Sequence, residues 1–300
     1  MPQSRKEVVI HADDLGMCHG ANLAFLELFR RGVCTCGSVM VPGPWSSEMA
    51  DLQARFPDLD IGVHLTLNAE KQHYRWRPLT RSQHGGLVDS DGYFWQNVQD
   101  LRRNAHPDAV EAELRAQIEA ALAAGIDVTH LDDHMGAVFC PEFVGVYVRL
   151  GREYRLPILI MESIQAYDPR HNLDEVDDGG VLAAAAAAAR AYGSPVFEAV
   201  LETPWRRGKS VESDYRALFA RAPKGLSFFA LHFTVPGEVE AIEPETASIR
   251  TQEYALFRSS VVEEILASGG YVLRGMRAFR AAMRDSGAST TTAPPQSLLA

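Results

Sequence analysis

Short apolar runs alternate with amphipathic stretches along most of the chain. The apolar runs predict buried strands, because glycine or polar turn residues bound them, and the amphipathic stretches predict helices. The predicted strands are 8–10, 37–41, 61–67, 128–132, 158–160, 196–200 and 226–231. The predicted helices are 22–31, 47–55, 108–124, 142–155, 183–189, 211–222 and 251–267. This alternation indicates an α/β protein with a parallel sheet, either open or closed into a barrel.

Two stretches of the sequence interrupt this alternation of strands and helices. Residues 68–95 hold two glycine-containing turns and five aromatic residues, and we expect a long loop inserted after a strand. Residues 285–300 are mainly serine, threonine, alanine and proline, which predicts a disordered tail. Residues 1–284 suit a single domain, because barrels of alternating strands and helices typically occupy about 250 residues.

Polar residues gather at the predicted strand ends, where the chemistry of parallel sheets is found. They are Asp13, Asp14, His64, Asp132, Asp133, His134 and His232. Each has a structural alternative, because a lone strand histidine often belongs to the core and an aspartate pair often closes a turn or caps a helix. Their coincidence at one end of the sheet favours a metal site, because burying so many ionisable groups uncompensated would cost on the order of several kcal/mol each.

Two imidazoles and one carboxylate are the ligand set of a hydrolytic site that holds zinc or a similar divalent ion. Such a set leaves positions open for water and substrate, and a second carboxylate can take the proton when that water attacks a carbonyl. Asp13 and Asp14 would point to opposite faces of a regular strand. We therefore expect them to share the site where the strand gives way to the Leu15-Gly16 turn.

Composition and charge narrow the range of partners. With 46% hydrophobic and 23% charged residues over 300 positions, the chain can fold as a globular protein without a structural metal, so a bound metal would serve function. The chain has 29 lysine and arginine residues and 39 acidic residues, which gives a net charge of −10. Without a basic cluster, this charge argues against nucleic acid as a binding partner. The absence of a signal peptide or a membrane-length apolar stretch predicts a cytoplasmic protein that binds no membrane. Its four cysteines are then expected to be buried free thiols.

Three segments in order resemble the signature segments of the YdjC-like carbohydrate deacetylases. They are His11-Ala12-Asp13-Asp14-Leu15-Gly16 with Gly20-Ala21-Asn22, Gly62-Val63-His64-Leu65-Thr66-Leu67, and Thr129-His130-Leu131-Asp132-Asp133-His134-Met135-Gly136. The resemblance covers residues 7 to 280 and implies a single-domain distorted (β/α) barrel of the polysaccharide-deacetylase type. It also implies one divalent metal ion, Zn²⁺ or Mg²⁺, and hydrolysis of N-acetyl groups from amino sugars.

Carried over by position, the resemblance assigns roles to five of the strand-end residues. Asp13 matches the family's catalytic base, and Asp14, His64 and His134 match its metal ligands. His232 lies in the segment 230–237, which resembles a late His-Pro-Gly motif in stretched form, and would be the general acid. Gly136 stands where many relatives carry a further histidine.

Aromatic side chains are candidates for binding the sugar faces of a substrate. The candidates are Trp45, Tyr74, Trp76, Trp95 and Trp205, and the alternative for those in residues 68–95 is that they pack this loop against the barrel. The expected partner is an acetylated amino sugar or oligosaccharide, and a homodimer is compatible with the sequence. Two other functions stay open: a different metal-dependent barrel hydrolase such as a phosphoesterase, and a sugar-binding relative without catalysis.

Overall fold

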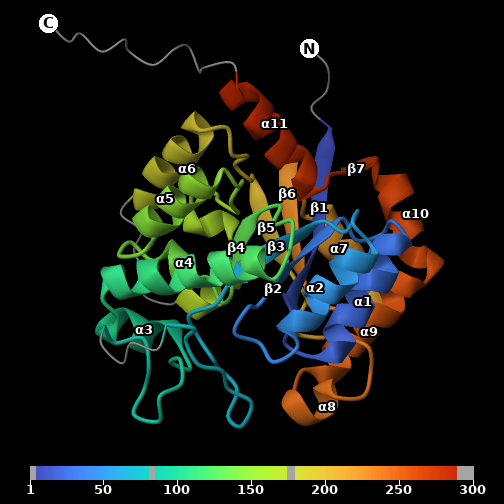
Figure 1. Cartoon of the computed structure of the whole chain (residues 1–300). Coiled ribbons are helices and arrows are strands. Elements are labelled where there is room, and N and C mark those ends of the chain that lie inside the picture. The colour runs from blue at the N-terminus through green and yellow to red at the C-terminus, as the bar shows by residue number, and fades with distance from the viewer. Residues whose placement is uncertain (1–4, 81–84, 174–179, 289–300) are drawn as a thin grey trace, which may run out of the picture.

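Seven parallel strands form the centre of the molecule (Figure 1). The computed structural model describes residues 5–80, 85–173 and 180–288. The strands are β1 (Lys6–Leu15), β2 (Cys36–Val39), β3 (Ile61–Leu65), β4 (Leu131–Asp133), β5 (Ala199–Glu202), β6 (Gly225–Leu231) and β7 (Tyr271–Leu273). Their order is β4-β3-β2-β1-β6-β5, and β7 pairs with the start of β1.

Backbone contacts through the segment 157–161 close this sheet into a distorted barrel. Leu131 of β4 forms a parallel bridge to Ile158, and Met161 forms one to Phe197, just before β5. The amide of Leu159 donates to the carbonyl of Leu131 at 2.9 Å, and the amide of Phe197 donates to the carbonyl of Ile160, also at 2.9 Å. The expected single-domain (β/α) barrel with parallel strands is confirmed, with 158–160 contributing isolated bridges in place of a regular strand.

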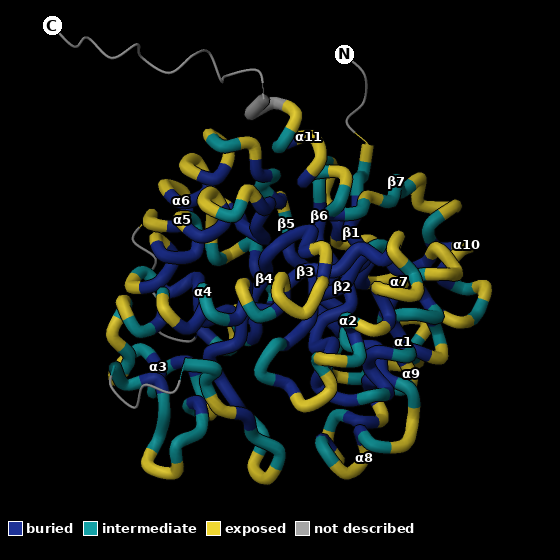
Figure 2. The backbone as a smooth tube through the Cα atoms, in the orientation of Figure 1, coloured by how far each residue is buried: buried dark blue, intermediate teal, exposed yellow. Residues whose placement is uncertain are grey.

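Helices surround the barrel and cover the outer face of its strands, whose residues are largely buried (Figure 2). Val8, Val9 and Ile10 of β1 are all fully buried, which explains why the strand reads as a continuous apolar run. The longer helices are α1 (His19–Arg30), α2 (Ser46–Arg55), α4 (Pro107–Ala123), α5 (Val144–Tyr154), α6 (Val181–Ala191), α7 (Val211–Ala220), α9 (Ala247–Arg258), α10 (Ser260–Gly269) and α11 (Met276–Ala288). Short helices are α3 (Val98–Asn104), α8 (Val239–Ile242), η1 (Ala137–Phe139), η2 (Ile164–Ala166) and η3 (Asp168–Leu173).

The one helix predicted over 251–267 is two helices, and this part of the prediction is wrong. Ser259 has extended backbone dihedrals, φ −83° and ψ 171°, which end α9. Its side chain accepts a hydrogen bond from the amide of Val261 at 3.3 Å and so caps α10. Apolar periodicity continues across this break, which is why the pattern alone does not show it.

The first residues of β1 and the end of α11 lie at the end of the barrel opposite the carboxyl ends of its strands (Figure 1). The inserted stretch 68–95, α3 and α8 lie at the carboxyl end; residues 81–84 of the insert are outside the described residues. Helix α11 continues past residue 284, where the tail was expected to begin, and residues 289–300 also lie outside the described part. Of the helices that the structure describes, none is both long and apolar enough to span a membrane.

Candidate metal centre

A bulge near the end of β1 brings two neighbouring aspartates to the same side of the strand. The register with β2 pairs Ala12 with Gly37 and then Leu15 with Val39, so β1 holds one extra residue. Asp14 has φ of +59°, a left-handed conformation that costs a non-glycine residue about 1–3 kcal/mol. Both aspartates line one cavity. They meet inside the strand at a bulge, and not in the following turn as the sequence indicated.

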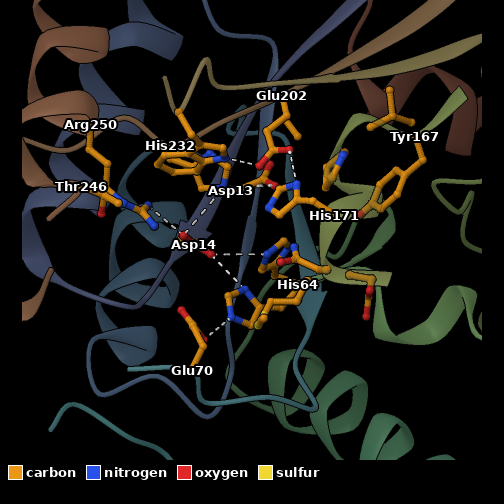
Figure 3. Close-up of a pocket in the computed structure, with 18 of the residues that line it drawn as sticks. Asp13, Asp14, His64, Glu70, Tyr167, His171, Glu202, His232, Thr246 and Arg250 are labelled. Carbon is orange, nitrogen blue, oxygen red and sulfur yellow. Dashed lines mark hydrogen bonds and ion pairs between the residues drawn. The ribbon is translucent and has the colours of Figure 1, made fainter. Parts of the chain in front are cut away.

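Asp14 and His64 point toward each other inside this cavity (Figure 3), and His134 offers a third ligand atom beside them. Asp14 Oδ1 lies 3.2 Å from His134 Nδ1 and 3.5 Å from His64 Nε2, and one ligand atom of each residue lies within 4.8 Å of the others. Asp14 Oδ1 is buried and makes no hydrogen bond. A buried carboxylate oxygen without a hydrogen bond, next to two imidazole nitrogens, fits a divalent cation.

Surrounding side chains contact the atoms of these three residues that do not face the point shared by their ligand atoms. His64 Nδ1 lies 3.0 Å from Ser38 Oγ and 3.1 Å from Asp132 Oδ2. His134 Nε2 lies 2.8 Å from Glu70 Oε2, and Arg250 donates to Asp14 Oδ2 at 2.8 Å. Partners of this kind fix imidazole tautomers and orientations in metal sites. The atoms that face the shared point are therefore left free to bind.

Among the described residues, two other groups of side chains also have the composition of a metal site. They are His11 with Cys36 and His130, and His11 with Asp13 and Asp132. Both depend on His11, whose Nδ1 lies 2.6 Å from Asp13 Oδ1 and whose Nε2 lies 3.0 Å from His130 Nε2. Because both ring nitrogens already have hydrogen-bond partners, His11 has no free ligand atom. The group of Asp14, His64 and His134 is the better cation site.

Charges inside the cavity shift the acid–base behaviour of its residues in different directions. Burial opposes ionisation of Asp14, but the charge of Arg250 and the neighbouring imidazoles of His134 and His64 hold its pKa well below the usual range. Burial raises the pKa of Asp13 well above its usual value. Burial opposes charge on His134, but Glu70 and Asp14 outweigh it and raise its pKa to about 9. A proton therefore occupies His134 when no cation is bound, and a cation must displace it.

His232 follows β6 and stands across the cavity from the histidine pair. Its Nε2 lies 4.0 Å from Asp13 Oδ2 and 3.9 Å from Asp14 Oδ2. Its Nδ1 lies 2.8 Å from Thr203 Oγ1, and Thr203 in turn donates to the buried carboxylate of Glu253 at 2.9 Å. Because the Thr203 proton goes to Glu253, the His232 Nδ1–H is the donor to Thr203. Burial and then the charge of Arg250 lower the pKa of His232 well below its usual value.

The remaining walls of the cavity contribute aromatic, acidic and paired cationic groups. Its volume is about 290 Å³. Trp205 packs beside His232 with ring centroids 4.7 Å apart and donates its indole N–H to Glu202, whose pKa burial raises to about 8. Lys71 pairs with Glu70 and Glu243, and Arg250 pairs with Asp14 and Glu243. Both cationic side chains among the described lining residues are therefore already neutralised.

The other aromatic candidates divide into two groups. Trp45 and Tyr74 line an adjoining groove of about 810 Å³, which shares Glu70, Lys71, Glu243 and Thr246 with the cavity. Trp45 is 38% exposed. Trp76 and Trp95 do not line the cavity; their indole N–H groups donate to the carbonyls of Asn68 and Gly86, and they pack the insert against the barrel.

Several cavity residues were not identified from the sequence. Glu70 follows β3 within the insert. Its position shortly after a predicted strand could have identified it as a candidate, as it did for the other strand-end residues. Asp133 was among the strand-end candidates but received no role of its own; both its oxygens are buried without partners, and burial raises its pKa well above the usual value. Glu243 and Arg250 come from the region of helices α8 and α9. The candidates were chosen at predicted strand ends, and neither residue follows a strand.

Comparisons with known proteins match this chain to one family. A family model described as YdjC-like protein matches residues 7–268. Proteins named carbohydrate deacetylase are 44% identical over 161 residues in Thermus thermophilus and 32% identical over 152 residues in Brevibacillus brevis. These matches cover 54% and 51% of this chain, and 56% and 58% of the two relatives. The aligned part of the chain thus spans somewhat more than half of each relative's length.

A solved structure from Enterococcus faecalis V583 shares the fold. It is described as a cellobiose-phosphate cleavage protein, and it superposes with a TM-score of 0.71 at 23% sequence identity. The match covers 92% of this chain and 99% of that one. At this identity the likeness concerns the fold alone, and it supports the distorted barrel.

We expect the protein to bind one divalent cation per chain and to lose that binding when either imidazole is removed. His64→Ala or His134→Ala should each weaken Zn²⁺ affinity by about 100-fold or more, because losing a supporting partner alone typically costs 10- to 100-fold. Isothermal titration calorimetry measures this directly. His171→Ala is the matched control, since His171 also lines the cavity but lies outside the trio. Unchanged affinity in both variants would show that the cation binds elsewhere.

Proposed function

The chain belongs to the YdjC-like protein family, and on that premise we propose that it is a metal-dependent carbohydrate deacetylase that hydrolyses the N-acetyl group of an amino sugar. The observation that carries this proposal is the grouping of three side-chain functions in one cavity. The trio of Asp14, His64 and His134 fits a cation, Asp13 is a buried carboxylate with a raised pKa, and His232 lies across from both. Amide hydrolysis needs an electrophile, a base and a proton donor.

Asp14, His64 and His134 would hold one divalent ion, Zn²⁺ or Mg²⁺. When bound, this ion would polarise the acetamide carbonyl and lower the pKa of water. The two imidazoles suit zinc, and the carboxylate suits either ion. Arg250 would keep Asp14 ionised and oriented, because it donates to Oδ2 while Oδ1 faces the shared point.

Asp13 would accept the proton of the attacking water. Its Oδ1 is held by His11, and its Oδ2 is directed toward His232 across the cavity. A general base works best when its pKa lies near the operating pH, and burial shifts the pKa of Asp13 in that direction. A C–O bond forms to the acetyl carbon as this proton leaves.

His232 would deliver the proton to the leaving amine. Because burial keeps its imidazole neutral, His232 must gain a proton before it can give one up. Asp13 is the neighbour that gains one, and its Oδ2 lies 4.0 Å from His232 Nε2. The proton removed from water then passes from Asp13 through His232 to the nitrogen as the C–N bond breaks, which gives acetate and an amine.

The substrate would be an acetylated amino sugar, alone or within an oligosaccharide. Trp205, Glu202 and the partner-free Asp133 offer an aromatic face and carboxyl groups suited to sugar hydroxyls. The adjoining groove, with Trp45 and Tyr74, would accept further sugar units. The cytoplasmic location and the homodimer remain predictions.

The charge pairing disfavours the phosphoesterase alternative. Phosphate recognition needs arginine or lysine groups that are free to donate. Lys71 and Arg250 already pair with carboxylates. Arg206, Arg207 and Lys209, which follow Trp205 in the chain and are the other basic residues near the site, do not line the cavity. A sugar-binding protein without catalysis would need no base beside a cation ligand, and the bulge in β1 places one there at a cost in strain.

A screen for acetate release tests the proposed activity. Purified protein is incubated with acetylated amino sugars and chitooligosaccharides, with and without a chelator, and acetate is measured enzymatically. The proposal predicts acetate release that the chelator abolishes and that added Zn²⁺ or Mg²⁺ restores. Release that is insensitive to thorough chelation would contradict metal dependence, and release of phosphate from sugar phosphates would favour the alternative.

Replacing Asp13 and Asp14 in turn should separate the base from the cation ligand. Asp13→Asn should retain the cation but lose nearly all turnover, because an amide keeps the shape of the carboxylate but accepts no proton at neutral pH. Asp14→Asn should weaken cation binding instead. Calorimetry and acetate release are measured on both variants. Wild-type turnover in Asp13→Asn would make Asp13 a structural residue.

Removing His232 should slow the reaction in a way that depends on the leaving group. His232→Ala should lower deacetylation by roughly 10²- to 10⁴-fold with little change in cation affinity. An acetyl substrate with a good leaving group needs no proton donor and should restore much of the rate in His232→Ala but not in Asp13→Asn. If His232→Ala loses the same fraction of the wild-type rate on both substrates, the proton-delivery role is ruled out.

A further inference from the structure

Two histidines that the proposed reaction does not use lie inside the barrel, beneath the cavity. His11 belongs to β1 and His130 directly precedes β4, and both side chains are completely buried. Neither lines the cavity. Their rings meet edge to face with centroids 5.1 Å apart. Burying two imidazoles here costs free energy unless their ring nitrogens are hydrogen-bonded, whereas apolar side chains would pack in the same place without that cost. Their presence therefore indicates a role that apolar residues could not fill.

An unbroken series of hydrogen-bond contacts connects these rings to Asp13. Thr129 Oγ1 lies 2.9 Å from His130 Nδ1, and His130 Nε2 lies 3.0 Å from His11 Nε2. His11 Nδ1 then lies 2.6 Å from Asp13 Oδ1. Each of the four ring nitrogens has a partner, so the series is fully satisfied.

Two neutral rings and the ionised form of Asp13 together fix the direction of this series. Burial lowers the pKa of His11 to about 4 and that of His130 to about 4, so each ring carries one proton at neutral pH. When Asp13 is ionised, as the proposed base must be before it takes a proton from water, it can only accept, so His11 then donates from Nδ1 and its Nε2 is bare. His130 must then donate from Nε2, and its bare Nδ1 accepts from the hydroxyl of Thr129.

A glycine on the neighbouring strand makes room for this arrangement. A Cβ atom on Gly62 of β3 would lie 2.6 Å from His130 Nε2 and 2.6 Å from Cε1, closer than real atoms approach. Any larger residue at position 62 would displace the ring whose proton faces His11. The position of the His130 ring therefore depends on Gly62 of β3 as well as on the chain that leads into β4.

We propose that Thr129, His130 and His11 form a one-directional series of hydrogen bonds that positions Asp13 for proton transfer. This inference rests on the proposed function of Asp13 as the base. The series holds Oδ1 from inside the barrel and leaves Oδ2 facing His232 in the cavity. His11 and His130 are positioning residues, since neither reaches the cavity.

Two substitutions of His130 separate positioning from packing. In His130→Gln the amide N–H can replace the Nε2–H donor to His11, whereas His130→Leu fills similar space and removes the donor. We expect His130→Leu to lower kcat by about 10- to 100-fold with KM and Zn²⁺ affinity unchanged, because a small misplacement of a reacting group can cost that much. His130→Gln should stay within about threefold of wild type. Full turnover in His130→Leu would overturn the proposal.

Nuclear magnetic resonance of the histidine side chains tests the series without any substrate. In ¹⁵N-labelled protein at neutral pH, His11 should carry its proton on Nδ1 and His130 on Nε2, assigned by their loss in His11→Asn and His130→Gln. The opposite tautomers would overturn the proposal even if His130→Leu fails to fold. Wild-type protein that releases no acetate from any sugar, but shows these tautomers, would refute the proposed function and leave the hydrogen-bond series intact.

Discussion

The burial of the Asp14 carboxylate is the constraint on which the site depends. An ionised carboxylate inside a barrel is costly unless charges and hydrogen bonds replace its water, and Arg250, His64 and His134 supply these. The compensation is incomplete. Among the described residues, Asp14 Oδ1 is buried without a hydrogen-bond partner, and it faces the imidazoles of His64 and His134. A divalent cation beside Asp14 Oδ1 would supply the contact that this oxygen lacks.

The barrel holds the two proton-handling groups by separate means. Asp13 is held from inside the barrel by His11, whereas His232 is held from the side by Thr203 and, through it, Glu253. Glu253 also accepts from Tyr215 and from the backbone amide of His232 at 2.6 Å. Both groups therefore have fixed orientations before substrate arrives, which is the condition for efficient proton transfer.

Strand geometry explains which parts of the site the sequence could predict. Residues two apart on a strand share a face, so His130, Asp132 and His134 all turn inward, as do His11 and Asp13. The strand-end positions of Asp14, His64, His134 and His232 could therefore be predicted to meet.

Other features depend on three-dimensional detail that no local pattern carries. The bulge that turns Asp14 inward is a register shift between β1 and β2, and the spacing of residues does not record it. Arg250 reaches Asp14 from a helix 236 positions later in the chain. The break at Ser259 and the packing of Trp76 and Trp95 likewise follow from backbone conformation and neighbours.

Anomalous diffraction from crystals grown with Zn²⁺ would test the central claim most directly. The account predicts one anomalous peak bounded by Asp14, His64 and His134, with His11 and His130 still hydrogen-bonded to each other. A peak between His11, Cys36 and His130, or no ordered ion at saturating Zn²⁺, would contradict it.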